Sequence, residues 1–192
     1  MANKQKLLAS AQKHIQRGSY AKAAQDYAQA LAEDPSDLRV MLKLGEAQQK
    51  DNDVVGAVET YSRVAHQYTG TGFLLKAAAV YKRILTIDPE NVVVHVRLAE
   101  VYQHLGLLSD AMSYYYAVAN ILQKKGDVAG YQDVLGRMAA IEPDNVGIRI
   151  KLAEHYSRIG DIEAAVEEFQ AAAELLRSTE RLDDYVKVAE RL

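Results

Sequence analysis

The side chains that could carry acid-base, nucleophilic or metal chemistry lack the spacing that such chemistry needs. The five histidines, His14, His66, His95, His104 and His155, show no H-E-x-x-H or other ligand spacing. Carboxylates are abundant, but they fall on the solvated faces of helical patterns, and no local grouping of Ser, His and Asp indicates a nucleophile. The absence of cysteine excludes disulfides and thiolate metal sites. We therefore expect no catalytic residue, no cofactor and no metal, and hence a protein that is not an enzyme.

The stretch GTGFLLK, residues 70–76, is only distantly similar to a phosphate-cradling loop. It lacks the final Gly-Lys-Ser/Thr, and it follows a helical pattern, whereas such loops follow a strand. We expect this stretch to be a flexible turn between two helices.

Composition excludes several classes of protein. The 192 residues are 49% apolar and 26% charged, as in ordinary globular chains. A formal net charge of -3 gives no reason to expect nucleic acid, because proteins that neutralise phosphates show a basic face or run. No apolar run approaches the roughly 18 residues that span a bilayer, and the start of the chain lacks the apolar core of a secretory signal. We expect no membrane insertion and a cytoplasmic location.

The elements that must position any functional residue are helices. Segments of about 11 to 17 residues carry apolar side chains at i, i+3, i+4 and i+7, and short breaks rich in Gly, Asp, Asn or Pro separate them. Breaks this short place consecutive helices antiparallel. The eleven helices are predicted at about 4–17, 20–33, 37–50, 54–69, 72–87, 91–105, 108–124, 127–141, 145–159, 162–177 and 181–192.

An internal repeat is the strongest pattern in the chain. The only prolines, Pro35, Pro89 and Pro143, lie 54 residues apart, and IDPENV at 87–92 returns as IEPDNV at 141–146. A shift of 54 also aligns Leu44 with Leu98 and Leu152, Glu46 with Glu100 and Glu154, Ala57 with Ala111 and Ala165, and Tyr61 with Tyr115 and Phe169. Repetition at a fixed period is typical of stacked helical units.

These aligned residues resemble the tetratricopeptide repeat, a 34-residue pair of antiparallel helices with small and aromatic residues at set positions. Residues 4–37 match it through Leu7, Ala11, Gly18, Ala23, Tyr27, Ala30 and Pro35, and units starting at 38, 92 and 146 match it in the same way. Small residues let two helices approach closely while the aromatic ring fills the space beside them. The resemblance covers essentially the whole chain and implies an all-α fold, a right-handed α–α superhelix of about eleven antiparallel helices.

The period of 54 is 34 plus 20, so each unit has three helices, as in a bacterial-type helical repeat array. We predict one domain over 1–192 with units at about 1–37, 38–91, 92–145 and 146–192, truncated at its C-terminus because the register places a further proline beyond Leu192. One position departs from the pattern. The close-packing Ala77 aligns with Tyr131 and Tyr185, so we expect a wider or shifted third helix in the later units.

The resemblance also implies which residues line the concave surface, since the first helix of each pair faces it. Carried onto this chain, the set is Arg39, Leu42, Lys43, Glu46, Gln49, Lys50, Val96, Arg97, Glu100, Gln103, His104, Ile150, Lys151, Glu154 and Arg158. In each unit a basic residue precedes an acid by three positions, as Lys43 precedes Glu46, and the two can pair on one helix face. Two interpretations stay open: a polar groove that binds a peptide or a partner helix, or surface ion pairs that only keep the repeat soluble.

The stretch SYYYAVA, residues 113–119, places three tyrosines on one helix. Tyr115 is the aligned core residue, so Tyr114 and Tyr116 must point elsewhere. They form either an exposed aromatic patch for a partner or half-buried contacts with neighbouring helices.

The function that the resemblance implies is a non-catalytic scaffold or adaptor that binds another protein or a peptide through its groove or its exposed ends. One alternative is a self-associating array, a homo-oligomer formed through the end helices. The other is a regulatory repeat module of a larger protein.

Overall fold

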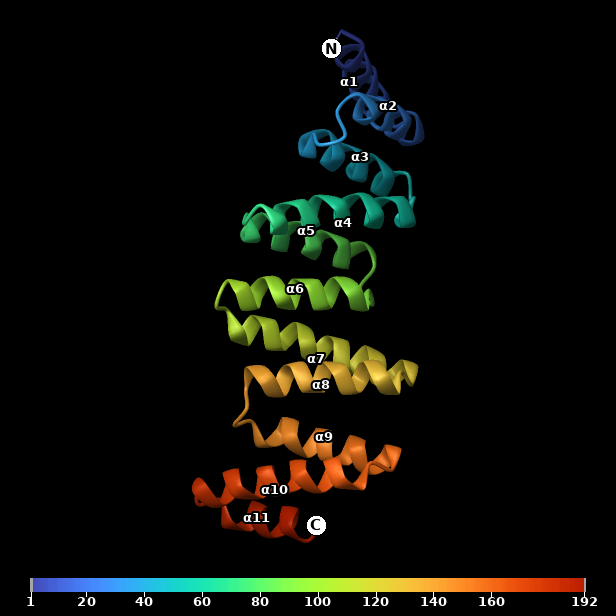
Figure 1. Ribbon diagram of the computed structural model, residues 1–192. Coiled ribbons are helices and arrows are strands. Elements are labelled where there is room, and N and C mark those ends of the chain that lie inside the picture. The colour runs from blue at the N-terminus through green and yellow to red at the C-terminus, as the bar shows by residue number, and fades with distance from the viewer. Residues whose placement is uncertain (1, 192) are drawn as a thin grey trace. The chain divides into compact units, whose positions relative to one another are not determined.

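The computed structural model describes residues 2–191 and contains only helices and turns over that range (Figure 1). All eleven expected helices are present, with ends within a few residues of their predicted bounds. This confirms the all-α repeat fold. The helices are α1 Ala2–Gln16, α2 Tyr20–Glu33, α3 Leu38–Lys50, α4 Val54–Gly70, α5 Leu74–Ile87, α6 Val92–His104, α7 Leu108–Lys125, α8 Val128–Ile141, α9 Val146–Ile159, α10 Ile162–Ser178 and α11 Leu182–Ala189.

The chain folds as two compact units, residues 1–107 with α1–α6 and residues 108–192 with α7–α11. Within each unit, consecutive helices run antiparallel and pack against each other (Figure 1). Each unit contains one complete copy of a three-helix arrangement in the same register, α3–α5 in the first and α9–α11 in the second, 108 residues apart.

The proline-containing loops stop one helix and start the next. α2, α5 and α8 end two residues before Pro35, Pro89 and Pro143, because proline cannot continue a helix. The residue two positions after each proline then caps the following helix. Its side chain accepts hydrogen bonds from free backbone N–H groups of the first turn, as expected of an N-cap; these caps are Asp37, Asn91 and Asn145.

Small residues bring neighbouring helices into contact as the repeat pattern requires. The Tyr61 ring of α4 is fully buried and packs on the backbone of α3 at Gly45. A Cβ atom at Gly45 would lie 2.7 Å from Cε1 of Tyr61, closer than van der Waals contact allows. In the second unit Ala153 and Phe169 occupy the same positions of α9 and α10 and share one hydrophobic cluster.

Tyrosine takes the place of the close-packing alanine in the later copies. Ala77 is completely buried in α5, and Tyr131 is also buried in α8, where its ring lies 5.3 Å from the ring of His155. Tyr185 of α11 is half-buried against the Ala153 and Phe169 cluster. These positions therefore accommodate an aromatic ring, and the wider helix spacing expected there stays a prediction.

Candidate functional site

The residues predicted to line the groove all lie on the first helices, α3, α6 and α9, and all reach the surface at least in part. The exposed ones are Arg39, Lys43, Glu46, Lys50, Arg97, His104, Lys151, Glu154 and Arg158, and the half-buried ones are Leu42, Gln49, Val96, Glu100, Gln103 and Ile150. The register of each helix therefore turns these side chains outward while the aligned Leu and small residues turn inward.

The ion pairs differ from the predicted ladder along each helix. Arg97 pairs with Glu100 on α6 at 3.0 Å, as the spacing of three positions predicts. Glu46 of α3 instead pairs with Arg83 of α5 at 2.9 Å, and Glu154 of α9 pairs with Arg191, which follows α11. The acid of the first helix thus joins the third helix of its own three-helix copy. These cross-helix pairs were missed because they join residues 37 positions apart in sequence.

Arg83 of α5 contacts side chains of both α3 and α4. Its guanidinium lies 4.8 Å from the centre of the Tyr61 ring, and its Nε donates a hydrogen bond to Gln49. Burial raises the pKa of Tyr61 to about 12, which the nearby Arg83 charge partly offsets and the Glu46 charge reinforces. Cation–π and charge-assisted contacts together fix the Arg83 side chain on this face.

Lys151 and Tyr116, which belong to two separate predicted sets, lie together in the second unit. The ammonium group of Lys151 on α9 lies 5.3 Å from the centre of the Tyr116 ring on α7. Tyr116 is 36% exposed, Tyr115 beside it is buried and Tyr114 is half-buried. An exposed ring beneath a cation, next to the other polar residues of α9, is the kind of side-chain cluster that protein partners contact.

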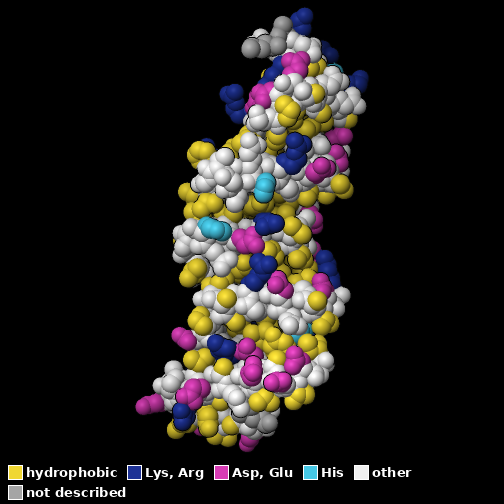
Figure 2. Space-filling model, in the orientation of Figure 1, with side chains coloured by type: hydrophobic (Ala, Val, Ile, Leu, Met, Phe, Trp, Pro, Cys, Tyr) yellow, Lys and Arg dark blue, Asp and Glu magenta, His cyan; other side chains and the backbone are white. Residues whose placement is uncertain are grey.

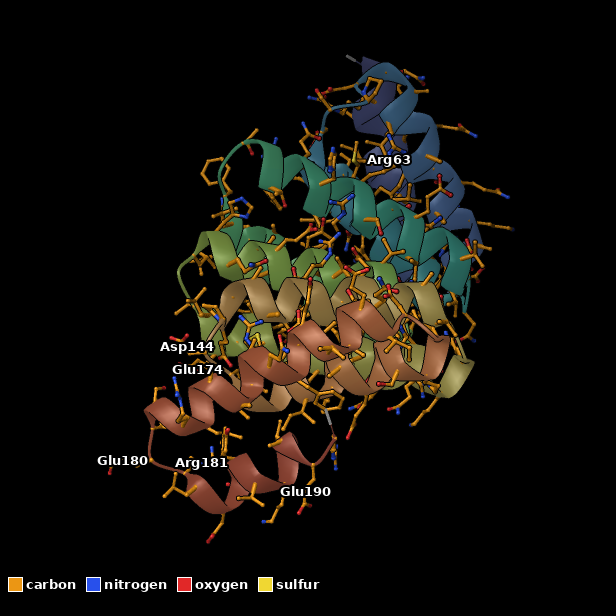
Figure 3. The ribbon with its side chains drawn as sticks, turned by 60° about the horizontal axis from the view of Figure 1, so that its bottom comes forward. Arg63, Asp144, Glu174, Glu180, Arg181 and Glu190 are labelled. Atoms are coloured by element: carbon orange, nitrogen blue, oxygen red, sulfur yellow. The ribbon has the colours of Figure 1, made fainter. Side chains whose placement is uncertain are left out.

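A groove of about 300 Å³ runs between α9 and α11. Its floor is apolar, and charged side chains form its rims, where Arg181, Asp184 and Lys187 make one network and Glu154 and Arg191 another. The floor residues are Val146, Ile150, Leu176 and Val188. Figure 3 places Arg181 at the turn between α10 and α11, with Glu180 pointing away from both helices.

A second hollow continues from the groove toward the loop between α8 and α9. The two hollows share Val146, Gly147 and Arg181, and the second is also lined by Asp144 and Thr179. Ile150 and Glu154 on α9 belong to the predicted set. The wall from α11 and the floor from α10 were missed, although a shift of 108 aligns Leu176 and Arg181 with the aromatic residues Tyr68 and Phe73.

The segment 70–76 forms the turn between α4 and α5. Gly72 has φ of 78°, which a residue without Cβ adopts easily, and Phe73 precedes the first turn of α5. The rings of Tyr68 and Phe73 meet edge to face at 6.3 Å, and Lys76 lies 4.6 Å from the centre of the Phe73 ring. The two aromatic rings at this turn therefore pack against each other.

No group of three His, Cys, Asp or Glu side chains within the described range is arranged to hold a metal ion. None of the described helices is both long enough and apolar enough to span a bilayer. On the face shown in Figure 2, acidic and basic side chains are interspersed, so this face lacks the broad basic field that nucleic acid attracts.

A family model described as tetratricopeptide repeat matches residues 14–71 and 74–130. The chain belongs to the tetratricopeptide repeat family. Members of the family present extended surfaces to other proteins and are generally not catalysts, so the exposed helix faces described above are surfaces of a protein-interaction fold.

Solved structures with tetratricopeptide-type folds also resemble the chain at low identity. MamA from Desulfovibrio magneticus RS-1 is 15% identical, with 93% of this chain and 97% of that chain covered and a TM-score of 0.34. A tetratricopeptide repeat protein from Parabacteroides merdae is 13% identical, with 100% and 92% covered and a TM-score of 0.33. The type III secretion translocator chaperone SycD of Yersinia enterocolitica is 19% identical, with 74% and 93% covered and a TM-score of 0.35. No match was found among curated proteins.

Proposed function

We propose that this tetratricopeptide repeat protein is a non-catalytic scaffold or adaptor of the cytoplasm that binds a partner protein or peptide through its exposed helix faces. The observation that carries the proposal is on the second unit, where α9 places Lys151 over the exposed ring of Tyr116 and also lines an apolar-floored groove. In protein interfaces a few anchor residues, often aromatic, supply most of the binding energy where they fill apolar pockets surrounded by a polar rim.

The first helices of the remaining copies supply polar contacts of the same kind. Lys43 and Arg97 are exposed cations at the positions that correspond to Lys151, and Leu42 and Val96 are half-buried apolar residues at the position of Ile150. A partner that contacts these helices would therefore meet a basic residue beside an apolar one on each.

The test is affinity capture with a triple charge reversal, Lys43→Glu, Arg97→Glu and Lys151→Glu, compared with the wild type. We expect recovery of the partner to fall at least about tenfold, because close interfacial charge pairs are worth more than 1.4 kcal/mol. The matched control reverses Lys22, Lys124 and Lys125, which are also exposed but lie outside the predicted surface. Equal recovery with the triple variant and the control would contradict binding through these faces.

Self-association is a second candidate, favoured by the exposed apolar side chains of α11. Leu182 is 62% exposed and Val186 is 52% exposed, and both lie on one face of that helix. Light scattering over a range of concentrations tests it: a strictly monomeric species at high concentration contradicts self-association, whereas an oligomer that Leu182→Glu with Val186→Glu disperses supports it.

A further inference from the structure

The groove between α9 and α11 has a counterpart in the first unit at α3 and α5. A shift of 108 aligns their lining residues, with Val146 on Leu38, Ile150 on Leu42, Val188 on Val80, and the ion pair Glu154–Arg191 on Glu46–Arg83. Both copies therefore have apolar residues on the first and third helices and a salt bridge that joins those helices.

The two copies differ at three of the positions that line the groove in the second copy. The first copy has Tyr68, which is half-buried, and Phe73, which is 54% exposed, and their rings meet edge to face at 6.3 Å. Lys76 covers both rings, at 4.6 Å from the centre of the Phe73 ring and 5.6 Å from that of Tyr68. In the first copy, two aromatic rings and a cation therefore stand at these three positions.

The second copy has smaller or charged side chains at the same three positions. Leu176 replaces Tyr68, Arg181 replaces Phe73 and Asp184 replaces Lys76. Leu176 is 1% exposed and lies in the groove floor, while Arg181 is held by a salt bridge to Asp184 at 2.6 Å. At these positions the second copy therefore lacks the aromatic rings of the first.

We propose that this groove binds an aromatic side chain of a partner protein, presented from a segment with acidic flanking residues. The inference rests on the proposed function, because it names the partner chemistry for part of the same surface. Val146 and Ile150 are half-buried, and with the nearly covered Leu176 and Val188 they form an apolar surface on which a ring can pack its large apolar area. Arg181, Lys187 and Arg191 outnumber the two acids of the rims, so they favour both the face of a ring and a nearby carboxylate.

Two capped peptides serve as probes, one with a single phenylalanine between acidic residues and the other with leucine at that position. Titration of the full chain, followed by NMR of the methyl groups of Ile150, Leu176 and Val188, reports on the groove itself. We expect ring-current shifts of these methyl groups with the phenylalanine peptide and an affinity about tenfold higher than for the leucine peptide, equivalent to about 1.4 kcal/mol. Equal affinity for both peptides, or shifts confined to other methyl groups, would overturn the proposal.

A pair of exchange variants makes the test reciprocal. Leu176→Tyr with Arg181→Phe gives the groove the aromatic residues of the first copy, and we expect it to lose at least about tenfold in affinity for the phenylalanine peptide. Tyr68→Leu with Phe73→Arg gives the first copy the residues of the groove and should create a second site for the same peptide. Thermal melting checks that each variant folds; Arg181→Phe alone, at an exposed position, replaces the first pair if that pair does not fold. Unchanged binding by every folded variant would exclude the groove.

The outcomes separate this inference from the proposed function. If the aromatic preference is absent while partner capture still depends on Lys43, Arg97 and Lys151, only the groove assignment fails. If the peptide binds the groove but capture is unaffected by those charge reversals, the proposed binding through the first helices fails and the groove assignment stands.

Discussion

His155 places a titratable group at a buried position that an apolar residue can also fill. It is 2% exposed, its Nδ1 lies 3.1 Å from the guanidinium of Arg158, and its Nε2 is buried without a hydrogen-bond partner. The ring packs against Tyr131 and Tyr156. The preceding copy has Val101 at this position, and that residue is equally buried. An apolar residue therefore satisfies the packing, and the imidazole adds a group whose charge depends on pH.

The pH dependence follows from the direction of the pKa shift. Burial lowers the pKa of His155 below its usual 6.5, and the Arg158 charge lowers it further. As pH falls below about 6.5, the unfolded chain binds a proton that the folded chain does not, so stability falls. We expect the melting temperature of the wild type to fall between pH 7.5 and 5.5, and His155→Val to remove part of that fall. Identical pH dependence in the two proteins, measured by thermal melting, would contradict a titrating role for His155.

The residue scale also shows why the surface clusters could be predicted only in part. Exposure of Lys43, Arg97 and Lys151 follows from the helical register alone, because the aligned leucine positions fix which face is buried. Their partners do not follow from it. Lys151 meets Tyr116 from another helix, and Glu154 meets Arg191, so these contacts depend on how three helices pack and not on local spacing.

At the scale of the helix, the loop after each proline combines a helix stop with a cap for the next helix. Asp37 accepts hydrogen bonds from the N–H groups of Arg39 and Val40, and Asn91 and Asn145 perform the same role in the later copies. Unlike these two asparagines, Asp37 is charged. Lys4 of α1 forms salt bridges with Asp34 at 2.8 Å and with Asp37 at 2.9 Å. Asp37 thus both caps α3 and links it to α1.

Two substitutions at Asp37 separate these roles. Asp37→Asn keeps a side-chain oxygen for the cap, as in the other two copies, but loses the charge that faces Lys4. Asp37→Ala loses both, so we expect it to be less stable than Asp37→Asn by about 1 kcal/mol, the usual value of an N-cap. Equilibrium urea denaturation followed by circular dichroism measures the difference. Equal stability of the two variants would show that the cap contributes little to α3.

The helix scale is where the sequence was most informative. The apolar periodicity and the short breaks predicted the positions of all the helices, and Pro35, Pro89 and Pro143 with the capping residues marked three of the breaks, since these signals act locally. The C-terminal end of α11 was less well predicted, at 192 against Ala189. The groove between α9 and α11 could have been found only by comparing copies, where Leu176 and Arg181 replace aromatic residues.

At the scale of the whole molecule, stability arises from contacts between consecutive helices within each unit. In a helical repeat protein, stability is approximately a sum of the stabilities of the helical units and of their interfaces with nearest neighbours. A core substitution should therefore destabilise the helices that touch it and leave helices of the other unit protected. This behaviour differs from that of a globular domain, in which one core lesion lowers protection throughout.

Phe169→Ala in α10 tests this expectation. Phe169 is 5% exposed and packs with Ala153, Leu176 and Val188, so removing its ring should cost about 3–5 kcal/mol locally. We expect hydrogen exchange to accelerate in α9, α10 and α11 while α1 and α2 keep the protection of the wild type. The matched control is Tyr27→Ala in α2, a ring that is 2% exposed, which should reverse the pattern. If either substitution lowers protection equally in both units, the chain unfolds as one cooperative body, and the nearest-neighbour description is wrong for this protein.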